Sequence, residues 1–483
     1  MLKLNDTDLL RTGVFINGSW SDTAGGAAIP VYNPSSGQVI VEVNGADREA
    51  TVAAIEGAEA AQKEWAARPA KERSAVLRRW FDLVVANSED LARILTAEQG
   101  KPLAEARAEI LYGAAFFEWF AEEAKRVYGE TIPSPDRERR MMVMKQPIGV
   151  CGAITPWNFP MAMIPRKAAP ALAAGCTMVL KPASATPLSA LALGELASRA
   201  GVPAGVFQVV PGSASVVGEE IVTNPIVRKI TFTGSTEVGS QLMAKAAPTV
   251  KKLSLELGGN APVLVFDDAD IDVAVKGAIA TKFRNMGQTC VCANRIYVQD
   301  GIYDRFVEAF SKAVAALKVG DGMLEDTQQG PLIDSDAVLK VQEHIEDALS
   351  NGGTLATGGK PHALGGTFFE PTVIANASAD MKIAREETFG PVAPLFRFTD
   401  EADGIRVAND TEYGLAAYVF TRDNGRVWRV TEGLEFGVIG VNTGNTSYEG
   451  SPFGGLKLSG VGREGSHHGI DEFLEIKYVC IAH

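Results

Sequence analysis

Cysteine is scarce in this sequence, and no disulfide framework can be read from it. The chain of 483 residues has an odd number of cysteines without regular spacing: Cys151, Cys176, Cys290, Cys292 and Cys480. This pattern is typical of a protein from a reducing compartment. Cys290 and Cys292 form a C-x-C pair with no further Cys or His cluster beside them. This argues against a zinc site, and we expect no metal.

Long apolar runs and basic runs are also missing. No stretch reaches the roughly 18 apolar residues that a membrane helix needs. The segment Met1–Thr12 is polar and charged, so we expect no signal peptide and a cytoplasmic protein. The 46 Lys and Arg residues are outnumbered by 59 Asp and Glu residues, which gives a net charge of −13. This balance argues against nucleic acid as a partner and says little else, since acidic surfaces commonly only confer solubility.

The composition that remains is that of an ordinary globular protein, 46% apolar and 22% charged, in a chain long enough for two or three domains. Residues 46–127 have the periodicity of long amphipathic helices. From residue 147 onward, short apolar runs alternate with helical segments, a rhythm typical of βαβ units on a parallel sheet. The expected strands are Ile148–Thr155, Thr177–Leu180, Val206–Val210 and Lys229–Phe232. The expected helices are Ala162–Ala174, Ser189–Ala200 and Val216–Val222.

A second α/β series extends from Val263–Phe266 to Val438–Val441. Two further segments, Arg140–Lys145 and Leu474–Cys480, look like strands that belong to neither series. Strands left over at such separated positions often pair with each other or with a partner subunit. We therefore expect them to contribute to an oligomerisation element.

The segment Phe283–Cys290, with the sequence FRNMGQTC, is the most informative part of the chain. It joins the amphipathic run Ile271–Met286 to the strand-like run Arg295–Val298 through a Gly-Gln-Thr turn. A cysteine on such a turn can present its sulfur to a cleft, although an isolated free cysteine is more often inert and buried. The segment resembles the active-site signature of the aldehyde dehydrogenase superfamily, in which this cysteine is the nucleophile.

This resemblance covers nearly the whole chain and implies an α/β fold with a Rossmann-type cofactor domain and an α/β catalytic domain. We place the cofactor domain at residues 1–126 and 147–255 and the catalytic domain at residues 256–450. A small β oligomerisation element would combine residues 127–146 with the tail, residues 451–483. The resemblance implies a dimer or a tetramer, and the sequence does not decide between them.

Two further residues fit the chemistry of an aldehyde-oxidising thiol. Asn158, in the proline-bracketed loop after a predicted strand, is assigned with the backbone N–H of Cys290 to bind the oxyanion. Glu256, between leucines and followed by two glycines, is assigned as the general base that activates water. Burial between apolar neighbours would raise the pKa of Glu256 toward the working pH. A base at this position favours hydrolysis to the free acid over transfer of the acyl group to coenzyme A.

The turn Gly234–Gly239 follows a predicted strand and begins a helix, which makes it a candidate anion site. It matches neither a P-loop nor the usual Rossmann fingerprint. By resemblance, Gly234 and Ser235 belong to the dinucleotide loop, and Thr155, Pro156 and Trp157 bind the cofactor as well.

The resemblance also places Lys181 on the adenosine ribose, Glu387 on the nicotinamide ribose and Phe389 beside it. Ser184 is the discriminating residue, because relatives that prefer NAD commonly carry a Glu at this position. A Glu would repel a 2′-phosphate, whereas a Ser has no charge and can donate a hydrogen bond. We therefore expect NADP to be preferred and NAD to be tolerated.

Arg166 and Arg284, near one substrate tunnel, suggest an aldehyde with a carboxylate at its far end. Both occur at positions used by succinate-semialdehyde dehydrogenases, and Ser447 matches the serine that this subfamily places before Pro-Phe-Gly-Gly. The loop Asn445–Ser451 departs from the subfamily pattern, with Asn445 and Thr446 in place of an apolar pair. Glutarate semialdehyde or an aromatic aldehyde therefore remain alternatives to succinate semialdehyde.

Cys292 gives rise to a separate hypothesis, because it lies two residues from Cys290 and could form a disulfide that silences it. A small buried side chain is an equally good interpretation.

Two other classes of protein are alternatives to an aldehyde dehydrogenase. A binding protein that kept the fold would typically have lost a catalytic residue. A thiol hydrolase would need a histidine base, and the five histidines lie far along the chain from Cys290.

Overall fold

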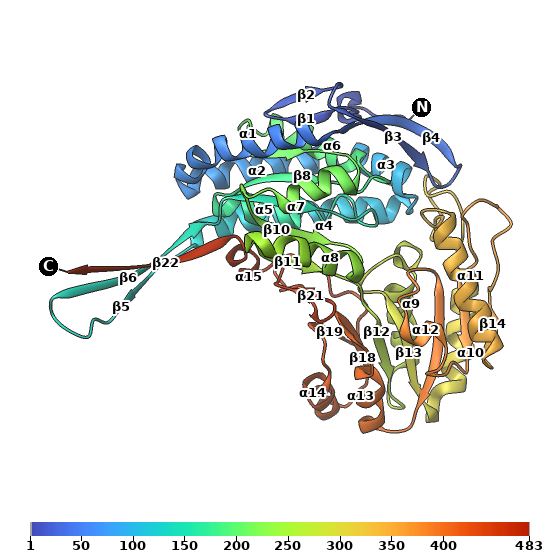
Figure 1. Ribbon diagram of the computed structural model, residues 1–483. Helices are drawn as coiled ribbons and strands as arrows, with labels where there is room; N and C mark the ends of the chain where they lie inside the picture. Colours follow the sequence, from blue (N-terminus) through green and yellow to red (C-terminus); the bar gives the residue numbers. More distant parts are fainter. Residues whose placement is uncertain (1, 483) are drawn as a thin grey trace.

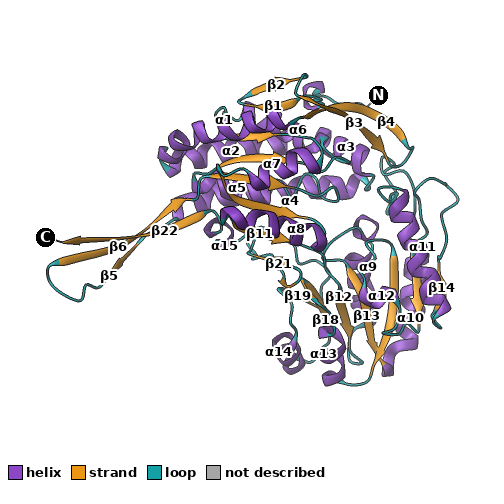
Figure 2. Ribbon diagram, in the orientation of Figure 1, coloured by secondary structure: helices purple, strands orange, loops and turns teal. Residues whose placement is uncertain are grey.

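Two open α/β sheets, one in each of two lobes, form the body of the protein, and a narrow β-arm projects from it (Figures 1 and 2). The structure is a computed structural model that describes residues 2–482. Residues 1 and 483, the first and last of the expected domains, lie outside the described residues. Among the helices within these residues, none is both long and apolar enough to cross a membrane.

The sheet of the first lobe has the strand order β2-β1-β9-β8-β7-β10-β11-β21. Its five central strands are parallel: β7 (Val150–Ile154), β8 (Thr177–Lys181), β9 (Phe207–Val209), β10 (Val227–Thr233) and β11 (Lys252–Glu256). The antiparallel edges are β1 (Val14–Ile16), β2 (Ser19–Ser21) and β21 (Gly460–Val461). The four strands expected from the sequence are confirmed, and a parallel sheet brings their carboxyl ends to one edge.

Helices cover this sheet. Four long ones come first, as the amphipathic pattern predicted: α1 (Arg48–Ala67), α2 (Ala70–Ala86), α3 (Ser88–Gln99) and α4 (Leu103–Glu123). The crossover helices are α5 (Pro165–Ala174), α6 (Leu188–Arg199), α7 (Glu219–Thr223) and α8 (Thr236–Ala246). Helix α5 begins later than expected, because Pro165 lacks an N–H and suits the first helical turn. The expected helix at 216–222 is split into a π-helical turn, Ala214–Gly218, followed by α7.

The sheet of the second lobe has the order β14-β15-β16-β13-β12-β18-β19 and is parallel except for β14. Its strands are β12 (Ala261–Val265), β13 (Ala293–Gln299), β14 (Thr354–Thr357), β15 (Thr372–Ala375), β16 (Val392–Phe398), β18 (Ala416–Phe420) and β19 (Val438–Val441). Its helices are α9 (Ile271–Lys282), α10 (Tyr303–Ala315), α11 (Ser335–Ser350), α12 (Lys382–Arg385), α13 (Glu401–Asn409) and α14 (Asn424–Gly433). The expected second α/β series is therefore confirmed.

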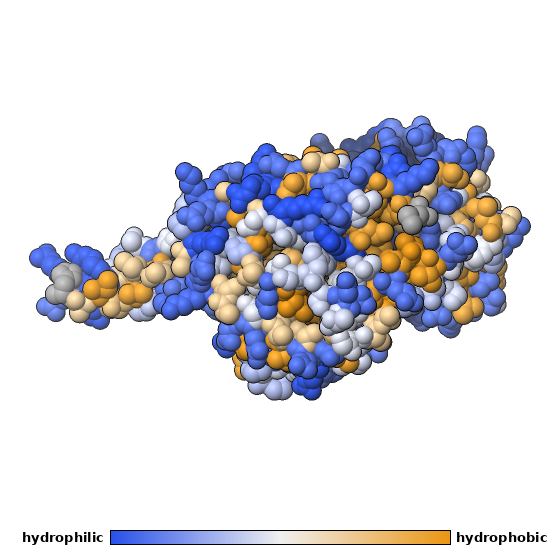
Figure 3. Space-filling view, turned by 90° about the horizontal axis from the view of Figure 1, so that it is seen from above, coloured by the Kyte–Doolittle hydropathy of each residue, from blue (hydrophilic) through white to orange (hydrophobic). Residues whose placement is uncertain are grey.

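The projecting arm is a three-stranded sheet of β5 (Glu130–Ile132), β6 (Arg139–Pro147) and β22 (Leu474–Ala482). Strands β6 and β22 pair antiparallel from Leu474 opposite Pro147 to Ala482 opposite Arg139, so the two leftover strands do pair with each other. Apolar side chains are visible on the surface of the arm (Figure 3), and Ile476 is 73% exposed. The sequence did not predict the hairpin of β3 (Gly25–Asn33) and β4 (Gln38–Ala46).

Short elements complete the fold. Strand β17 (Tyr413–Gly414) of the second lobe pairs antiparallel with β20 (Leu456–Lys457) of the tail. Helix α15 (His468–Asp471) precedes the last strand. Strand β21 of the tail pairs with β11, opposite Glu256. The tail therefore returns to the first lobe beside the carboxyl end of that strand.

Candidate active site

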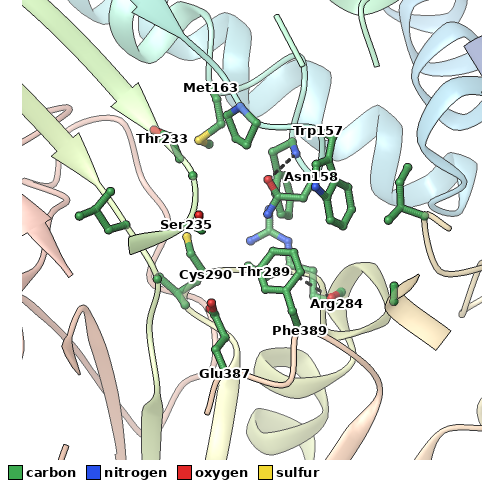
Figure 4. A pocket seen from close by; sticks show the side chains of 18 of the residues that line it. Trp157, Asn158, Met163, Thr233, Ser235, Arg284, Thr289, Cys290, Glu387 and Phe389 are labelled. Atoms are coloured by element: carbon green, nitrogen blue, oxygen red, sulfur yellow. Dashed lines mark hydrogen bonds between the residues drawn. The ribbon is translucent and has the colours of Figure 1, made fainter. Parts of the chain in front are cut away.

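A cavity of about 410 Å³ lies between the two lobes and receives side chains from both. The first lobe contributes the loop after β7 and the turn after β10, and the second contributes the segment after α9 and residues 387–389. Figure 4 shows Cys290, Glu387, Asn158 and Arg284 around one space. The position is the one expected of open α/β sheets, which bind ligands beyond the carboxyl ends of their strands.

Cys290 reaches this cavity through an unusual turn. Helix α9 ends at Lys282, so only part of the amphipathic run Ile271–Met286 is α-helical. Asn285 and Met286 have φ values of 50° and 56°, and Gly287 follows with φ 76°. A Cβ on Gly287 would lie 2.2 Å from the carbonyl oxygen of Gly390, so only glycine fits here. Left-handed residues cannot continue a right-handed helix, and the chain therefore leaves the helix before the cysteine.

The surroundings of the Cys290 thiol favour its neutral form. Burial raises its pKa to about 12, Glu387 and Glu256 add to the shift, and Arg166 opposes it. The residue is nevertheless partly exposed and lines the cavity. A thiol held in this state becomes a nucleophile only when a base removes its proton.

Glu256 ends strand β11 and is 3% exposed. Its Oε2 finds no hydrogen-bond partner among residues 2–482. Burial and the neighbouring carboxylate of Glu464 raise the pKa of Glu256 well above its usual range, while Arg166 and Lys167 oppose the shift. The cavity wall includes the next two residues, 257 and 258, and not Glu256 itself. Its carboxyl group thus lies behind the wall, dry and without a fixed partner.

Asn158 lies on the loop after β7, lines the cavity and is 6% exposed. Its Nδ2 donates to the carbonyl oxygen of Gln288 at 2.9 Å, and its Oδ1 accepts from the backbone N–H of Phe159 at 3.1 Å. The amide therefore joins the first lobe to the segment that carries Cys290. An amide nitrogen has two protons, so one remains for a ligand in the cavity.

Arg166 sits in the first turn of α5 and is 3% exposed. Its Nε lies 3.0 Å from Glu464 Oε2, and its guanidinium lies 4.0 Å from the ring centre of Phe453. Lys167 also contacts Glu464 and donates to Thr233 Oγ1 at 2.7 Å. Sequence reasoning assigned no role to Glu464 or Lys167, because their meeting depends on the tail folding back onto α5.

Arg284 and Ser447 also line the cavity, so all three residues assigned to a substrate carboxylate lie around one space. The Arg284 guanidinium lies 4.8 Å from the ring centre of Phe159. A second hollow of about 590 Å³ shares Arg284, Ser447, Phe159 and Tyr112 with the first. These side chains thus form part of the wall of both hollows.

The turn after β10 forms the opposite side of the cavity. Gly234 and Ser235 line it, and the Ser235 side chain accepts from the backbone N–H of Val238 at 3.4 Å, which caps α8. The rings of Trp157 and Phe389 meet edge to face at 5.5 Å across the lobes. Pro156 lines the cavity too, whereas Thr155 is buried in the wall and donates its N–H to the carbonyl oxygen of Lys181.

Lys181 ends β8 and Ser184 follows three residues later, and both lie outside the cavity lining. Burial lowers the pKa of Lys181 to about 8. The one hydrogen bond of its Nζ within residues 2–482 is to the carbonyl oxygen of Pro182 at 3.2 Å. Ser184 is exposed, and its Oγ lies 3.5 Å from the carbonyl oxygen of Gly212. Lys181 therefore keeps donors for a ligand, whereas Ser184 would have to give up its long hydrogen bond to Gly212 to donate to one.

Glu387 points toward Cys290 (Figure 4), and its Oε1 accepts from the backbone N–H of Gly259 at 3.2 Å. Burial raises the pKa of Glu387 to about 7. The neighbouring residue Thr388 contacts His344 Nδ1 at 3.1 Å through its Oγ1, and the other ring nitrogen lies 3.3 Å from Glu386. Sequence reasoning missed His344, because nothing in the sequence shows that α11 packs against this segment.

Cys292 is buried, and its thiol donates to the carbonyl oxygen of Lys282 at 3.3 Å. Both Cys290 and Cys292 are free thiols in the structure. No group of three or more His, Cys, Asp or Glu side chains within residues 2–482 is arranged to hold a metal ion.

A thiol and a free amide donor thus meet at one cavity, with a buried carboxyl group behind its wall and a helix N-terminus on its far side. Comparison with known proteins gives the same picture. The sequence model of the "Aldehyde dehydrogenase family" matches residues 20–479. The succinate-semialdehyde dehydrogenase [NADP(+)] of Escherichia coli (strain K12) is 61% identical, with 99% of this chain and 100% of that protein covered.

The glutarate-semialdehyde dehydrogenase of Pseudomonas putida is also 61% identical and covers 100% of both chains. Among solved structures, the succinate-semialdehyde dehydrogenase from Burkholderia pseudomallei superposes with a TM-score of 0.99 at 59% identity, covering 100% of both chains. The fold and the expected resemblance are therefore confirmed.

Proposed function

This chain belongs to the aldehyde dehydrogenase family, and on that premise we propose that it oxidises succinate semialdehyde to succinate with NADP through an intermediate on Cys290. The observation that carries the proposal is the presence of Arg166 and Arg284 in the same cavity as the thiol. Two guanidinium groups there suit a substrate with an aldehyde at one end and a carboxylate at the other.

The first step requires a base, because the Cys290 thiol has a raised pKa. Glu256 is the proposed base, since a carboxylate with a raised pKa is a stronger proton acceptor than an exposed one. The sulfur then bonds to the aldehyde carbon, and the carbonyl oxygen takes the negative charge. The free proton of the Asn158 amide and the N–H of Cys290 are proposed to hold that oxygen.

When bound, the nicotinamide would supply the oxidation as the acceptor of hydride from the thiohemiacetal carbon. The chain's own task is then to release the product from the thioester on Cys290. Glu256 first releases the thiol proton to solvent and then takes a proton from a water molecule, whose oxygen attacks the thioester carbon as the carbon–sulfur bond breaks. Cys290 leaves as thiolate and the acid is free. The partnerless Oε2 of Glu256 supports this role, since no bond within the protein has to break first.

The arginines are not equivalent in the structure. Arg166 is already paired with Glu464 at 3.0 Å, whereas Arg284 rests on the ring of Phe159. Arg284 also lines the second hollow. We therefore assign the larger share of carboxylate binding to Arg284 and a supporting share to Arg166 and Ser447.

Glutarate semialdehyde is the second candidate substrate, because a relative of equal identity carries its name. The loop Asn445–Ser451 is the part that would decide chain length. Its Tyr448 is 58% exposed, and a Cβ on Gly450 would lie 2.6 Å from the Tyr448 ring, so the loop is shaped by this contact. Either substrate keeps the same mechanism and the same carboxylate contacts.

The cofactor preference rests on Ser184 and Lys181. Lys181 keeps hydrogen-bond donors, and Ser184, whose one donor makes only a long bond to Gly212, has no charge to repel a 2′-phosphate. The N-terminus of α8, capped by Ser235, and the Trp157–Phe389 pair on the cavity side also fit a dinucleotide. The relative from Escherichia coli is named for NADP(+), which supports the same preference here.

Steady-state kcat/KM for succinate semialdehyde, glutarate semialdehyde and benzaldehyde, each with NADP and NAD, tests the proposal. We expect succinate semialdehyde with NADP to lead by about tenfold, roughly 1.4 kcal/mol. Arg284→Met should lower kcat/KM for the two acidic aldehydes by about 10–100-fold, since a charge-assisted hydrogen bond contributes about 1.5–3 kcal/mol.

The same substitution should leave benzaldehyde within about threefold of the wild type, since benzaldehyde has no carboxylate for Arg284 to bind. Arg305→Met, on an exposed helix far from the cavity, is the matched control. Equal losses for all three aldehydes would show that Arg284 does not select the substrate by its carboxylate.

We also propose the division into a cofactor domain, a catalytic domain and an oligomerisation element as drawn from the sequence. Exposed apolar side chains on the arm, Ile476 and Tyr478 among them, support a homo-oligomer. The free cysteines support a reducing, cytoplasmic location.

A further inference from the structure

We propose that the buried pair Lys101–Glu109 is a positioning device for the oxyanion donor Asn158. The inference deepens the proposed function and rests on it, because it concerns the same amide. Neither residue lines the cavity, so both would act through the loop that carries Asn158.

Lys101 is 1% exposed and makes three contacts that converge on this loop. Its Nζ donates to the carbonyl oxygen of Asn158 at 2.8 Å and pairs with Glu109 Oε2 at 2.5 Å. It also lies 3.8 Å from the ring centre of Phe159. Glu109 continues the contact, since its Oε1 accepts from the backbone N–H groups of Met161 and Ala162, both at 3.1 Å.

The carbonyl oxygen of Asn158 accepts hydrogen bonds from both lobes. Lys101 donates to it from the first lobe, and Asn285 Nδ2 donates to it from the second at 3.0 Å. The side chain of Asn158 meanwhile donates to Gln288. The peptide unit and the amide are thus fixed by different partners, which is what a preorganised donor requires.

Lys101 lies where the lobes touch. It follows Gly100, a left-handed residue with φ 93° that ends α3. Gly322 and Gly330 of the second lobe pack against the backbone here, since a Cβ on either would come within 2.5 Å or less of the carbonyl oxygens of Lys101 and Gly100 respectively. Lys101 therefore links the position of the Asn158 loop to the packing of the two lobes.

Burial of this pair has a cost that stability alone does not explain. Taking two charges out of water is unfavourable, and apolar residues of similar volume often stabilise a core equally well or better. A lysine and a glutamate at these positions provide something apolar residues cannot, which is directed hydrogen bonds to one carbonyl and two N–H groups. A role in placing Asn158 accounts for them.

A double-mutant cycle in kcat/KM tests this inference. Asn158→Ala should lower kcat/KM by about 10²–10³-fold, the usual loss of an oxyanion donor. Lys101→Met in the wild-type background should lower it by about 10–100-fold, for benzaldehyde as well as for acidic aldehydes. In the Asn158→Ala background, Lys101→Met should cost less than about threefold, because a positioning residue has no effect once its target is gone.

Lys101→Met leaves the Glu109 charge buried without its partner and can destabilise the protein. The double variant Lys101→Met, Glu109→Gln removes both charges and keeps an oxygen for Met161 and Ala162. It should recover thermal stability and retain the kinetic loss. Lys251→Met is the matched control, since Lys251 also holds two backbone carbonyls, those of Asn224 and Val227, away from the cavity.

The outcomes separate the inference from the proposed function. If Asn158→Ala costs nothing, the oxyanion role itself is wrong. If Asn158→Ala is damaging and Lys101→Met costs the same in both backgrounds, the positioning role is overturned. Recovery of both stability and full kcat/KM in the double variant would likewise show that the pair is purely structural.

Discussion

The two ends of the site differ in their exposure to water, and the difference assigns them different tasks. At the catalytic end, Glu256, Glu464, Arg166 and Lys167 are each no more than 5% exposed and interact in a dry cluster. At the cofactor rim, Ser184 is exposed and makes only one long contact, at 3.5 Å. Charges interact strongly where water is excluded and weakly where it screens them.

This contrast explains why each end holds the residue types it does. A buried carboxyl group has its pKa moved far from the usual range, which suits a base that must work near neutral pH. An exposed serine cannot drive chemistry, but it leaves room for a charged group on the ligand. Rate should therefore depend on the dry end, and the choice of cofactor on the wet rim.

The largest expected effect comes from breaking the dry end. Glu256→Gln keeps the volume and removes the base, so kcat should fall by about 10²–10⁴-fold, the usual contribution of a positioned base. If water activation is the main loss, the acyl group should accumulate on Cys290 and mass spectrometry should detect it. Stopped-flow absorbance at the reduced-nicotinamide wavelength should show a burst close to one equivalent per site.

Glu308→Gln is the matched control for this substitution, since Glu308 is an exposed carboxylate of α10 outside the cavity lining. Its kcat should equal that of the wild type. A Glu256→Gln variant that turns over normally would remove Glu256 from the mechanism. A slow variant without a burst or acyl-enzyme would place its role before the oxidation, at the thiol.

A smaller effect is expected from changing the wet rim. Ser184→Glu adds a carboxylate where the 2′-phosphate is proposed to bind, so the NADP/NAD ratio of kcat/KM should fall by about 10–100-fold. Because the position is exposed, salt should screen the added charge, since the screening length is about 10 Å at 0.1 M salt. The fall in the NADP/NAD ratio should therefore be smaller at about 0.5 M salt than at about 0.05 M salt. Ser184→Gln, of similar size and no charge, is the control. An equal shift in both variants would make the effect steric.

How much of this could be predicted from the sequence follows the same division between local and long-range features. The parallel strands and crossover helices of the first lobe were predicted because apolar runs alternate with helices within a short stretch. The turn at Asn285–Gly287 was not, since left-handed Asn and Met leave no pattern in an amphipathic run. The amphipathic periodicity of the sequence extends past the residue at which the helix ends.

The site shows the same limit. Cys290, Asn158 and Arg284 come from segments with recognisable motifs, and the structure brings them to one cavity. Glu464 and His344 escaped, because each acquires its partners only when a distant element folds back: the tail onto α5, and α11 onto residues 386–388. Their partners are more than 40 residues away in the chain, as Glu464 and Lys167 illustrate with a separation of 297.

The smallest expected effect concerns Glu387, which stands between the two ends and is only partly buried. Burial raises its pKa to about 7 from an ordinary value of 4.5. Between these two pH values, the folded protein therefore holds a proton that the unfolded chain has released. The stability that this group contributes is present below pH 4.5 and is lost as pH rises to 7.

Glu387→Gln removes this pH-dependent loss and keeps an oxygen for the Gly259 N–H. Its unfolding free energy should match the wild type at pH 4.5 and exceed it by about 1–2 kcal/mol at pH 8. Denaturant unfolding at both pH values measures this, with Glu435→Gln on the surface as the control. A constant difference at both pH values would mean that Glu387 is ionised throughout, and that this carboxyl group belongs with the wet rim.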